Sequence, residues 1–275
     1  MRLKLNIVST YRAQIYGFAI LWILVFHGGA INSSDFSFGV SGLGWLNSVI
    51  GVGNVGVDIF LFLSGISLYF SFTKDPDYRS FIKKRLQRVA ILLALTYLAI
   101  YLFSQQAPEL YELWEIALTR IPVFIIGSWF GKFVYDKREV NPAWAILILI
   151  GVFAFAYVLH AGMLDGMAKR LFYAVGGISG CYALALVFLL FDKIPIVGKG
   201  LNLFFGFFGA FTLELYCTQG MLNQILRMLP IYEVGNVGQF AIMAVCAIVL
   251  AWIAMKLCNA LIRQLKKSAA PEPKQ

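Results

Sequence analysis

The chain has 275 residues, of which 60% are hydrophobic and 13% are charged, and its mean hydropathy is +0.77. A soluble domain cannot cover so much apolar surface. The composition therefore excludes an ordinary soluble enzyme and indicates a polytopic membrane protein. The formal net charge is +9. Because the basic residues are spread over the segments between apolar stretches, we expect no nucleic-acid partner.

Apolar windows recur along the whole chain, and a helix needs about 20 such residues to cross a bilayer. Eight windows qualify: residues 14–31, 48–72, 88–105, 115–134, 142–160, 171–191, 201–225 and 237–258. We therefore predict an all-α fold, a polytopic membrane helix bundle with about 8 transmembrane helices. A single transmembrane domain is expected over residues 1–265, followed by a disordered cytoplasmic tail over residues 266–275.

The basic residues predict the orientation of these spans. If the N-terminus is cytoplasmic, nearly all of the 23 basic residues fall in cytoplasmic segments. The exceptions are Arg120, Lys169, Arg170 and Arg227. This positive-inside bias predicts an N-in/C-in topology, with both termini cytoplasmic and an even number of spans.

A histidine lies inside the first predicted span. His27 ends the run from Tyr16 to Phe26 and sits about two-thirds of the way across, at about 1.5 Å per residue. A near-neutral imidazole is suited to general acid–base catalysis and can also act as a nucleophile. The alternative is a neutral imidazole that holds neighbouring helices together.

Two further charged residues lie near the outer ends of predicted spans. A carboxylate in hydrocarbon costs about 2.5–3.5 kcal/mol on insertion scales, so Asp58 needs an explanation. It could orient and charge-stabilise His27, or it could pair with Arg120 on the fourth predicted span. A purely structural ion pair between two helices explains the pair equally well.

A second polar group of residues belongs to the seventh predicted span. Glu214 lies near its middle, and Thr218 follows one helical turn later on the same face. Functional and structural interpretations of Glu214 remain open. Under the predicted topology Gln219 falls in the outer half of the membrane, as do His27, Asp58 and Arg120, which is where a ligand arriving from outside would meet them.

Residues 51–56 match the glycine pattern of dinucleotide-binding loops. That pattern needs a strand before it and a helix after it, whereas here it opens a membrane span. We therefore interpret these glycines, and Gly176, Gly177 and Gly180 in the sixth predicted span, as points where helices approach closely.

Five segments together resemble the integral-membrane acyltransferase 3 family. They are residues 16–27, 56–65, 78–88, 120–127 and 209–216, in the family's order. Members of that family move an acyl group from acyl-CoA to sugars of envelope or exported glycans. The resemblance implies acyl-CoA, with acetyl-CoA expected first, as the donor, and a glycan or lipid-linked sugar as the acceptor. It also implies a bacterial inner membrane, in contact with membrane lipids, as the location.

The resemblance also implies roles for individual residues. His27 would act as base or acyl relay, with Asp58, Arg120 and Glu214 as further catalytic candidates. The basic loop before the third span would hold the phosphates of coenzyme A through Lys83, Lys84, Arg85 and Arg88. The alternative role of that loop is to set topology and contact anionic lipids. Thioester chemistry needs no metal, and we expect none.

The chain departs from the family pattern in three places. Tyr16 occupies the position of a common basic residue, although Arg12 stands one turn earlier. Gln219, which cannot act as a base, occupies the position of a second histidine. The middle of the family core is shortened, which leaves less room for donor and acceptor together unless subunits associate as a homo-oligomer. Two rival functions follow: an inactive relative that acts as a structural partner in glycan assembly, and a small transporter or flippase.

Overall fold

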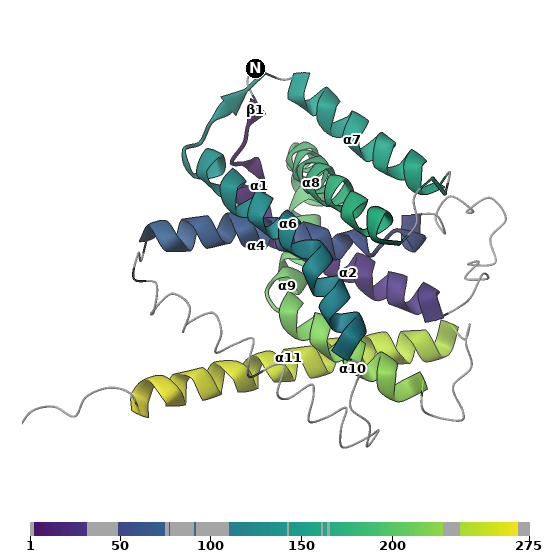
Figure 1. Ribbon diagram of the computed structural model, residues 1–275. Coiled ribbons are helices and arrows are strands. Elements are labelled where there is room, and N and C mark those ends of the chain that lie inside the picture. Colours follow the sequence, from purple (N-terminus) through teal and green to yellow (C-terminus); the bar gives the residue numbers. More distant parts are fainter. Residues whose placement is uncertain are drawn as a thin grey trace, which may run out of the picture. The chain divides into compact units, whose positions relative to one another are not determined.

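The computed structural model describes residues 3–31, 49–74, 77, 91, 110–141, 143–160, 162–163, 166–227 and 237–268. Nearly all of these residues are helical, which confirms the all-α prediction (Figure 1). Most of the predicted third span and of the predicted tail lie outside the described residues. The whole predicted coenzyme A loop lies outside them as well.

The chain packs as two units, one of residues 1–74 and 109–212 and the other of residues 75–108 and 213–275. The second unit contains α11 (Val237–Ser268) and all but the first residue of α10 (Thr212–Arg227). The described elements of the first unit are β1 (Leu3–Lys4), α1 (Ile7–Thr10), α2 (Arg12–Ile31), α4 (Val55–Lys74), α6 (Leu110–Tyr135), β2 (Glu139–Val140), α7 (Ala143–His160), α8 (Gly166–Phe191) and α9 (Pro195–Gly209).

Three helices of the described part are long and apolar enough to cross a membrane. They contain residues Val55–Lys74, Phe172–Phe191 and Gly238–Leu265. A fourth span results if α9 and α10, which are separated by a short break, cross together. The apolar stretches Arg12–His27 and Ala143–Val158 are shorter. The chain is therefore an integral membrane protein by length and composition, whereas the number of about eight spans and the N-in/C-in topology remain predictions.

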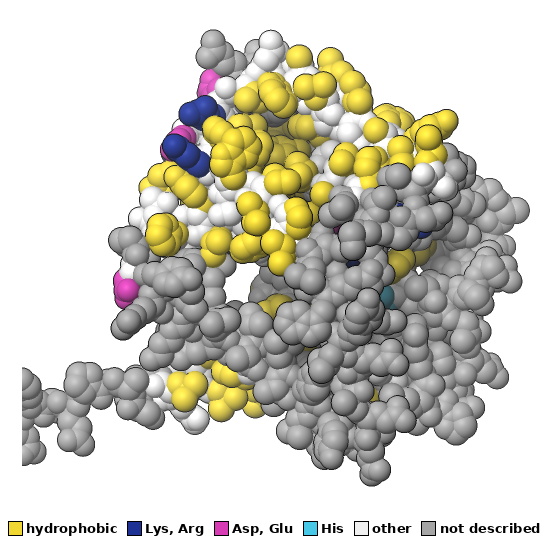
Figure 2. Space-filling model, in the orientation of Figure 1, with side chains coloured by type: hydrophobic (Ala, Val, Ile, Leu, Met, Phe, Trp, Pro, Cys, Tyr) yellow, Lys and Arg dark blue, Asp and Glu magenta, His cyan; other side chains and the backbone are white. Residues whose placement is uncertain are grey.

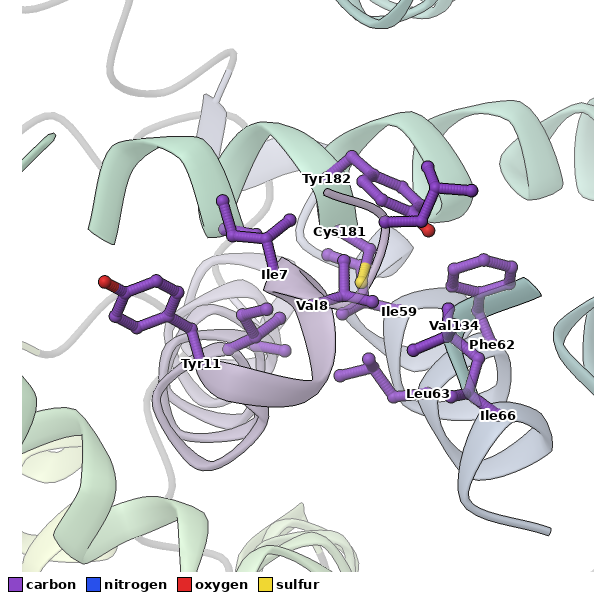
Figure 3. Packing of buried hydrophobic residues seen from close by; sticks show 14 of the residues in the cluster. Ile7, Val8, Tyr11, Ile59, Phe62, Leu63, Ile66, Val134, Cys181 and Tyr182 are labelled. Carbon is purple, nitrogen blue, oxygen red and sulfur yellow. The ribbon is translucent and has the colours of Figure 1, made fainter. Parts of the chain in front are cut away.

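The core of the first unit forms where α1, α4, α6 and α8 meet. Ile59, Phe62 and Leu63 recur at helical spacing on α4 and are fully buried (Figure 3). Val8 from α1 and Cys181 from α8 are fully buried in the same cluster. The cluster combines residues from early in the unit's sequence (α1) with residues from late in it (α8). These neighbours pack against α4, the helix that carries Asp58, from several sides.

Glycines allow α4 to pack closely on its neighbours. A Cβ atom on Gly127 of α6 would lie 2.2 Å from the carbonyl oxygen of Phe62 on α4. On the other side of α4, a Cβ on Gly56 would lie 2.7 Å from Cγ1 of Ile23 on α2. No larger residue fits at either place without moving a helix. The predicted close approach is therefore confirmed at Gly53, Gly56, Gly176 and Gly177 and is wrong at Gly51, where a Cβ would meet nothing within 4 Å.

A short pair of strands ties the N-terminal segment to the connection between α6 and α7. Leu3 of β1 pairs antiparallel with Val140 of β2, and the N–H of Leu5 donates to the carbonyl of Arg138 at 3.0 Å. The two segments therefore lie next to each other. If the helices between them cross the membrane, the number of crossings is even; the four spans expected there remain a prediction.

The described surface is largely apolar on the face shown in Figure 2. On α7 the side chain of Phe153 is 74% exposed and that of Ile146 is 60% exposed. Exposed side chains of this size would aggregate in water but are stable against hydrocarbon. The surface therefore agrees with the membrane location that the composition indicates.

Candidate active site

The contacts between α2 and α4 show the level at which His27 lies along α4. The hydroxyls of Tyr16 on α2 and Ser64 on α4 lie 3.2 Å apart. Further along, Phe26 lies against Gly53, because a Cβ on Gly53 would lie 2.6 Å from the Cβ of Phe26. The two helices are therefore antiparallel, and the half-buried His27 lies level with the turn that precedes α4.

Asp58 lies one turn into α4 and is fully buried. Its Oδ2 atom lies 3.9 Å from Nε of Arg120 on α6. The α8 backbone approaches from another side, since a Cβ on Gly177 would lie 2.6 Å from the Cβ of Asp58. Of the two partners that the sequence left open for Asp58, the structure therefore shows the ion pair with Arg120.

Arg120 also binds a residue that the sequence analysis missed. Its Nη2 atom donates to Oδ1 of Asn54 at 2.7 Å. Asn54 precedes Asp58 by four residues, so the two side chains can lie on one side of the helix start, and this spacing was the available signal. Tyr173 of α8 lies within electrostatic range of Asp58 and Arg120. Three helices, α4, α6 and α8, and the turn before α4 thus converge on one buried ionic cluster.

His27 and the ionic cluster lie at the same end of the α2–α4 pair. From the register, His27 is roughly five or six residues beyond Asp58 along the helix axis, which is about 8 Å at about 1.5 Å per residue. Asn54 lies between these two levels. The guanidinium of Arg120, bound to Asn54, therefore extends from Asp58 toward the level of the histidine.

The cluster can act on a polar ligand electrostatically. Among the described residues, neither oxygen of Asp58 accepts a hydrogen bond, so the carboxylate keeps its capacity to accept one. A buried guanidinium can stabilise negative charge that develops on a carbonyl oxygen. In a low-polarity setting both effects are stronger than they would be in water.

The residues predicted on the seventh span lie in α10. Glu214 is buried, and the hydroxyl of Thr218 lies 3.0 Å from the carbonyl oxygen of Glu214 and 3.1 Å from that of Ala247 on α11. The second contact joins α10 to α11 within the second unit. Gln219 is completely buried. These residues belong to a different unit from Asp58 and Arg120.

The predicted donor site belongs to the segment before the third predicted span. Lys83, Lys84, Arg85 and Arg88 lie outside the described residues. In the described parts of the chain, no group of three or more histidine, cysteine, aspartate or glutamate side chains is arranged to hold a metal ion.

The described part of the chain is nearly all helical, has an apolar surface and holds a buried ionic cluster between its helices. These features define the class, an integral membrane protein with a polar site. Residues 17–116 match the family model described as an acyltransferase domain, that of the acyltransferase 3 family. The comparisons with curated proteins and with solved structures find no match.

The family match confirms the resemblance over just over a third of the chain. It covers α2, α4 and the beginning of α6, and it includes His27 and Asp58. Arg120 and Glu214 lie beyond its end. The match indicates membrane acyltransferase activity.

Proposed function

We propose that the chain is a membrane O-acyltransferase that moves an acyl group, acetyl in the first instance, from acyl-CoA to a sugar hydroxyl of an exported or surface glycan. One observation carries the proposal. The segment that matches the acyltransferase family contains His27 and Asp58, and the structure places the Asp58–Arg120 pair at the same end of α2 and α4 as His27.

In the proposed reaction a sugar hydroxyl attacks the thioester carbonyl carbon of the donor. His27 accepts the hydroxyl proton as the new carbon–oxygen bond forms. The carbon–sulfur bond then breaks, and the coenzyme A thiolate leaves and takes the proton from the imidazolium. A two-step route is also open, in which His27 first carries the acyl group and the sugar hydroxyl then displaces it.

The ionic cluster would support this chemistry through charge. Arg120 would stabilise the negative charge that develops on the thioester oxygen. Asp58 keeps the guanidinium in place and balances its charge, and Asn54 fixes its direction. Because a buried charge without its partner is costly, Asp58 and Arg120 act as one unit.

The donor would enter from the cytoplasm and the acceptor from outside. Lys83, Lys84, Arg85 and Arg88 would bind the phosphates of coenzyme A, because guanidinium and ammonium groups are suited to phosphate oxygens. The proposed location is a bacterial inner membrane, with both termini cytoplasmic. Glu214 remains a further candidate residue for the reaction.

The test is the O-acyl ester content of surface glycans, measured by mass spectrometry. It compares cells that express the intact chain, its His27→Ala variant, or neither. His160→Ala is the matched control, because the chain has two histidines. Ester mass increments are expected with the intact chain and with His160→Ala, and not with His27→Ala at equal membrane abundance.

Identical glycan profiles for the intact chain and His27→Ala would contradict the proposal. The shortened, inactive relative would then be the better description. A purified preparation supplied with acyl-CoA provides a second readout, since release of coenzyme A does not depend on knowing the acceptor in the cell.

A further inference from the structure

The last helix of the chain is longer than a membrane span requires. α11 is one continuous helix of 32 residues, which is about 48 Å at about 1.5 Å per residue (Figure 1). The hydrocarbon core of a bilayer is about 30 Å thick. The helix therefore either extends beyond the hydrocarbon or crosses it at a large tilt. In both cases its last turns lie among the lipid headgroups.

The charge of α11 is confined to these last turns. Residues 237–268 contain four basic residues, no aspartate and no glutamate. The basic residues are Lys256, Arg263, Lys266 and Lys267, so all of them belong to the C-terminal part of the helix. Lys256 and Arg263 are both exposed. Positive charge without acidic neighbours at the end of a membrane helix favours anionic headgroups.

Lys256 and Arg263 share one face of α11. Nζ of Lys256 lies over the indole ring of Trp252, 5.3 Å from its centroid. Arg263 follows Lys256 by seven residues, which is about two turns, so both side chains begin on one face. Ala251 and Cys258, which are fully buried, lie about 120–160° around the helix axis from these two cations. The basic face, which consists of Lys256 and Arg263, therefore points away from the packed face of the helix.

Apolar side chains continue on another side of the same turns. Leu257, Leu261 and Leu265 are exposed, and their spacing of four residues places them on one stripe. The stripe lies about 100–180° around the axis from the basic face. A helix with leucines on one side and cations on the other is suited to the boundary between hydrocarbon and headgroups. Trp252 fits the same boundary, because indole rings gather there.

Ammonium and guanidinium groups bind phosphate oxygens, and a guanidinium can do so at two points. We propose that the basic face of α11 binds the phosphodiester headgroups of anionic phospholipids in preference to zwitterionic ones, whose own cation compensates the phosphate. A lipid is favoured over a soluble anion because the leucine stripe of the same turns is stable beside acyl chains. This interaction involves neither His27 nor the ionic cluster, so it is independent of acyl transfer.

The test is native mass spectrometry of the full-length protein, released from micelles that contain equal amounts of phosphatidylglycerol and phosphatidylcholine with the same acyl chains. The variant is Lys256→Gln with Arg263→Gln. Lys132→Gln with Lys199→Gln is the matched control, since it removes the same charge at two other exposed positions. We expect the intact protein and the control to retain phosphatidylglycerol preferentially, and the variant on α11 to reduce this preference roughly tenfold.

A second variant separates lost charge from lost structure. Lys256→Arg with Arg263→Lys keeps both charges and should keep the preference within about twofold, because the attraction to the membrane surface depends mainly on charge. Loss of the preference in this variant as well would overturn the proposal.

Three further results would overturn it. The first is an intact protein that retains both lipids equally. The second is a control pair that lowers the preference as much as the pair on α11, since the cations would then act only through the total charge. The third is displacement of the retained lipid by inorganic phosphate at constant ionic strength, since the face would then bind a soluble anion.

Discussion

Neutralising one member of the Asp58–Arg120 pair should destabilise the protein far more than neutralising both. Asp58→Asn removes the negative charge with almost no change of shape, and Arg120→Gln removes the positive charge. Each single variant leaves one buried charge without its partner, which typically costs about 3–5 kcal/mol. The double variant leaves no buried charge and should lose less than the sum of the two.

The coupling energy follows from the geometry. At the 3.9 Å separation of Oδ2 and Nε, two unit charges attract by about 4 kcal/mol when the effective dielectric constant is about 20. Arg120 keeps its hydrogen bond to Asn54 in the Asp58→Asn variant, so part of its polar surroundings survives. We therefore expect the cycle to return a coupling of roughly 3 kcal/mol.

The assay is equilibrium unfolding in mixed micelles, in which the fraction of denaturing detergent is raised and tryptophan fluorescence is followed. The chain contains six tryptophans. The intact protein, both single variants and the double variant are measured at one ionic strength. Additive losses, with the double variant within about 0.5 kcal/mol of the sum, would refute a coupled buried pair.

Two other predictions concern the packing of the first unit. Gly127→Ala should lower the free energy of unfolding by about 1–3 kcal/mol, because its Cβ overlaps the backbone of Phe62, whereas Gly206→Ala, which meets open space, should not destabilise. Thermal unfolding in detergent micelles measures both variants, and equal midpoints would contradict the close helix contact. Burial and the 2.5 Å hydrogen bond to Asp192 raise the pKa of Tyr11 from 10.0 to about 12. The stability that the neutral phenol contributes is therefore complete below pH 10 and is lost as the pH rises toward 12; in Tyr11→Phe this part of the pH dependence, followed by circular dichroism, should vanish.

Hydropathy located most helices of the described chain but not their breaks. The second predicted span begins at residue 48, whereas α4 begins at Val55, because a turn containing Asn54 precedes it. The seventh predicted span is two helices, since α9 ends at Gly209 and α10 begins at Thr212. A sliding average of apolar character cannot detect a break between two apolar segments. It also could not show that α11 continues to Ser268.

The sequence predicted the two charged residues of the candidate site, Asp58 and Arg120, but not its neutral residue, Asn54. Asp58 and Arg120 are conspicuous because a charge in an apolar window has few explanations. Asn54 is not, since a neutral amide in a glycine-rich segment is typical of a turn. The choice between His27 and Arg120 as the partner of Asp58 depends on how α2 and α6 are placed around α4, which sequence spacing does not contain.

The pairing of β1 with β2 has a consequence for the order of biosynthesis. Residues 3–5 cannot form their hydrogen bonds until the ribosome has made residues 138–140, roughly 135 residues later. At about 5–20 residues per second, this delay is on the order of ten seconds. The first strand therefore joins the fold only after α2, α4 and α6 have been synthesised.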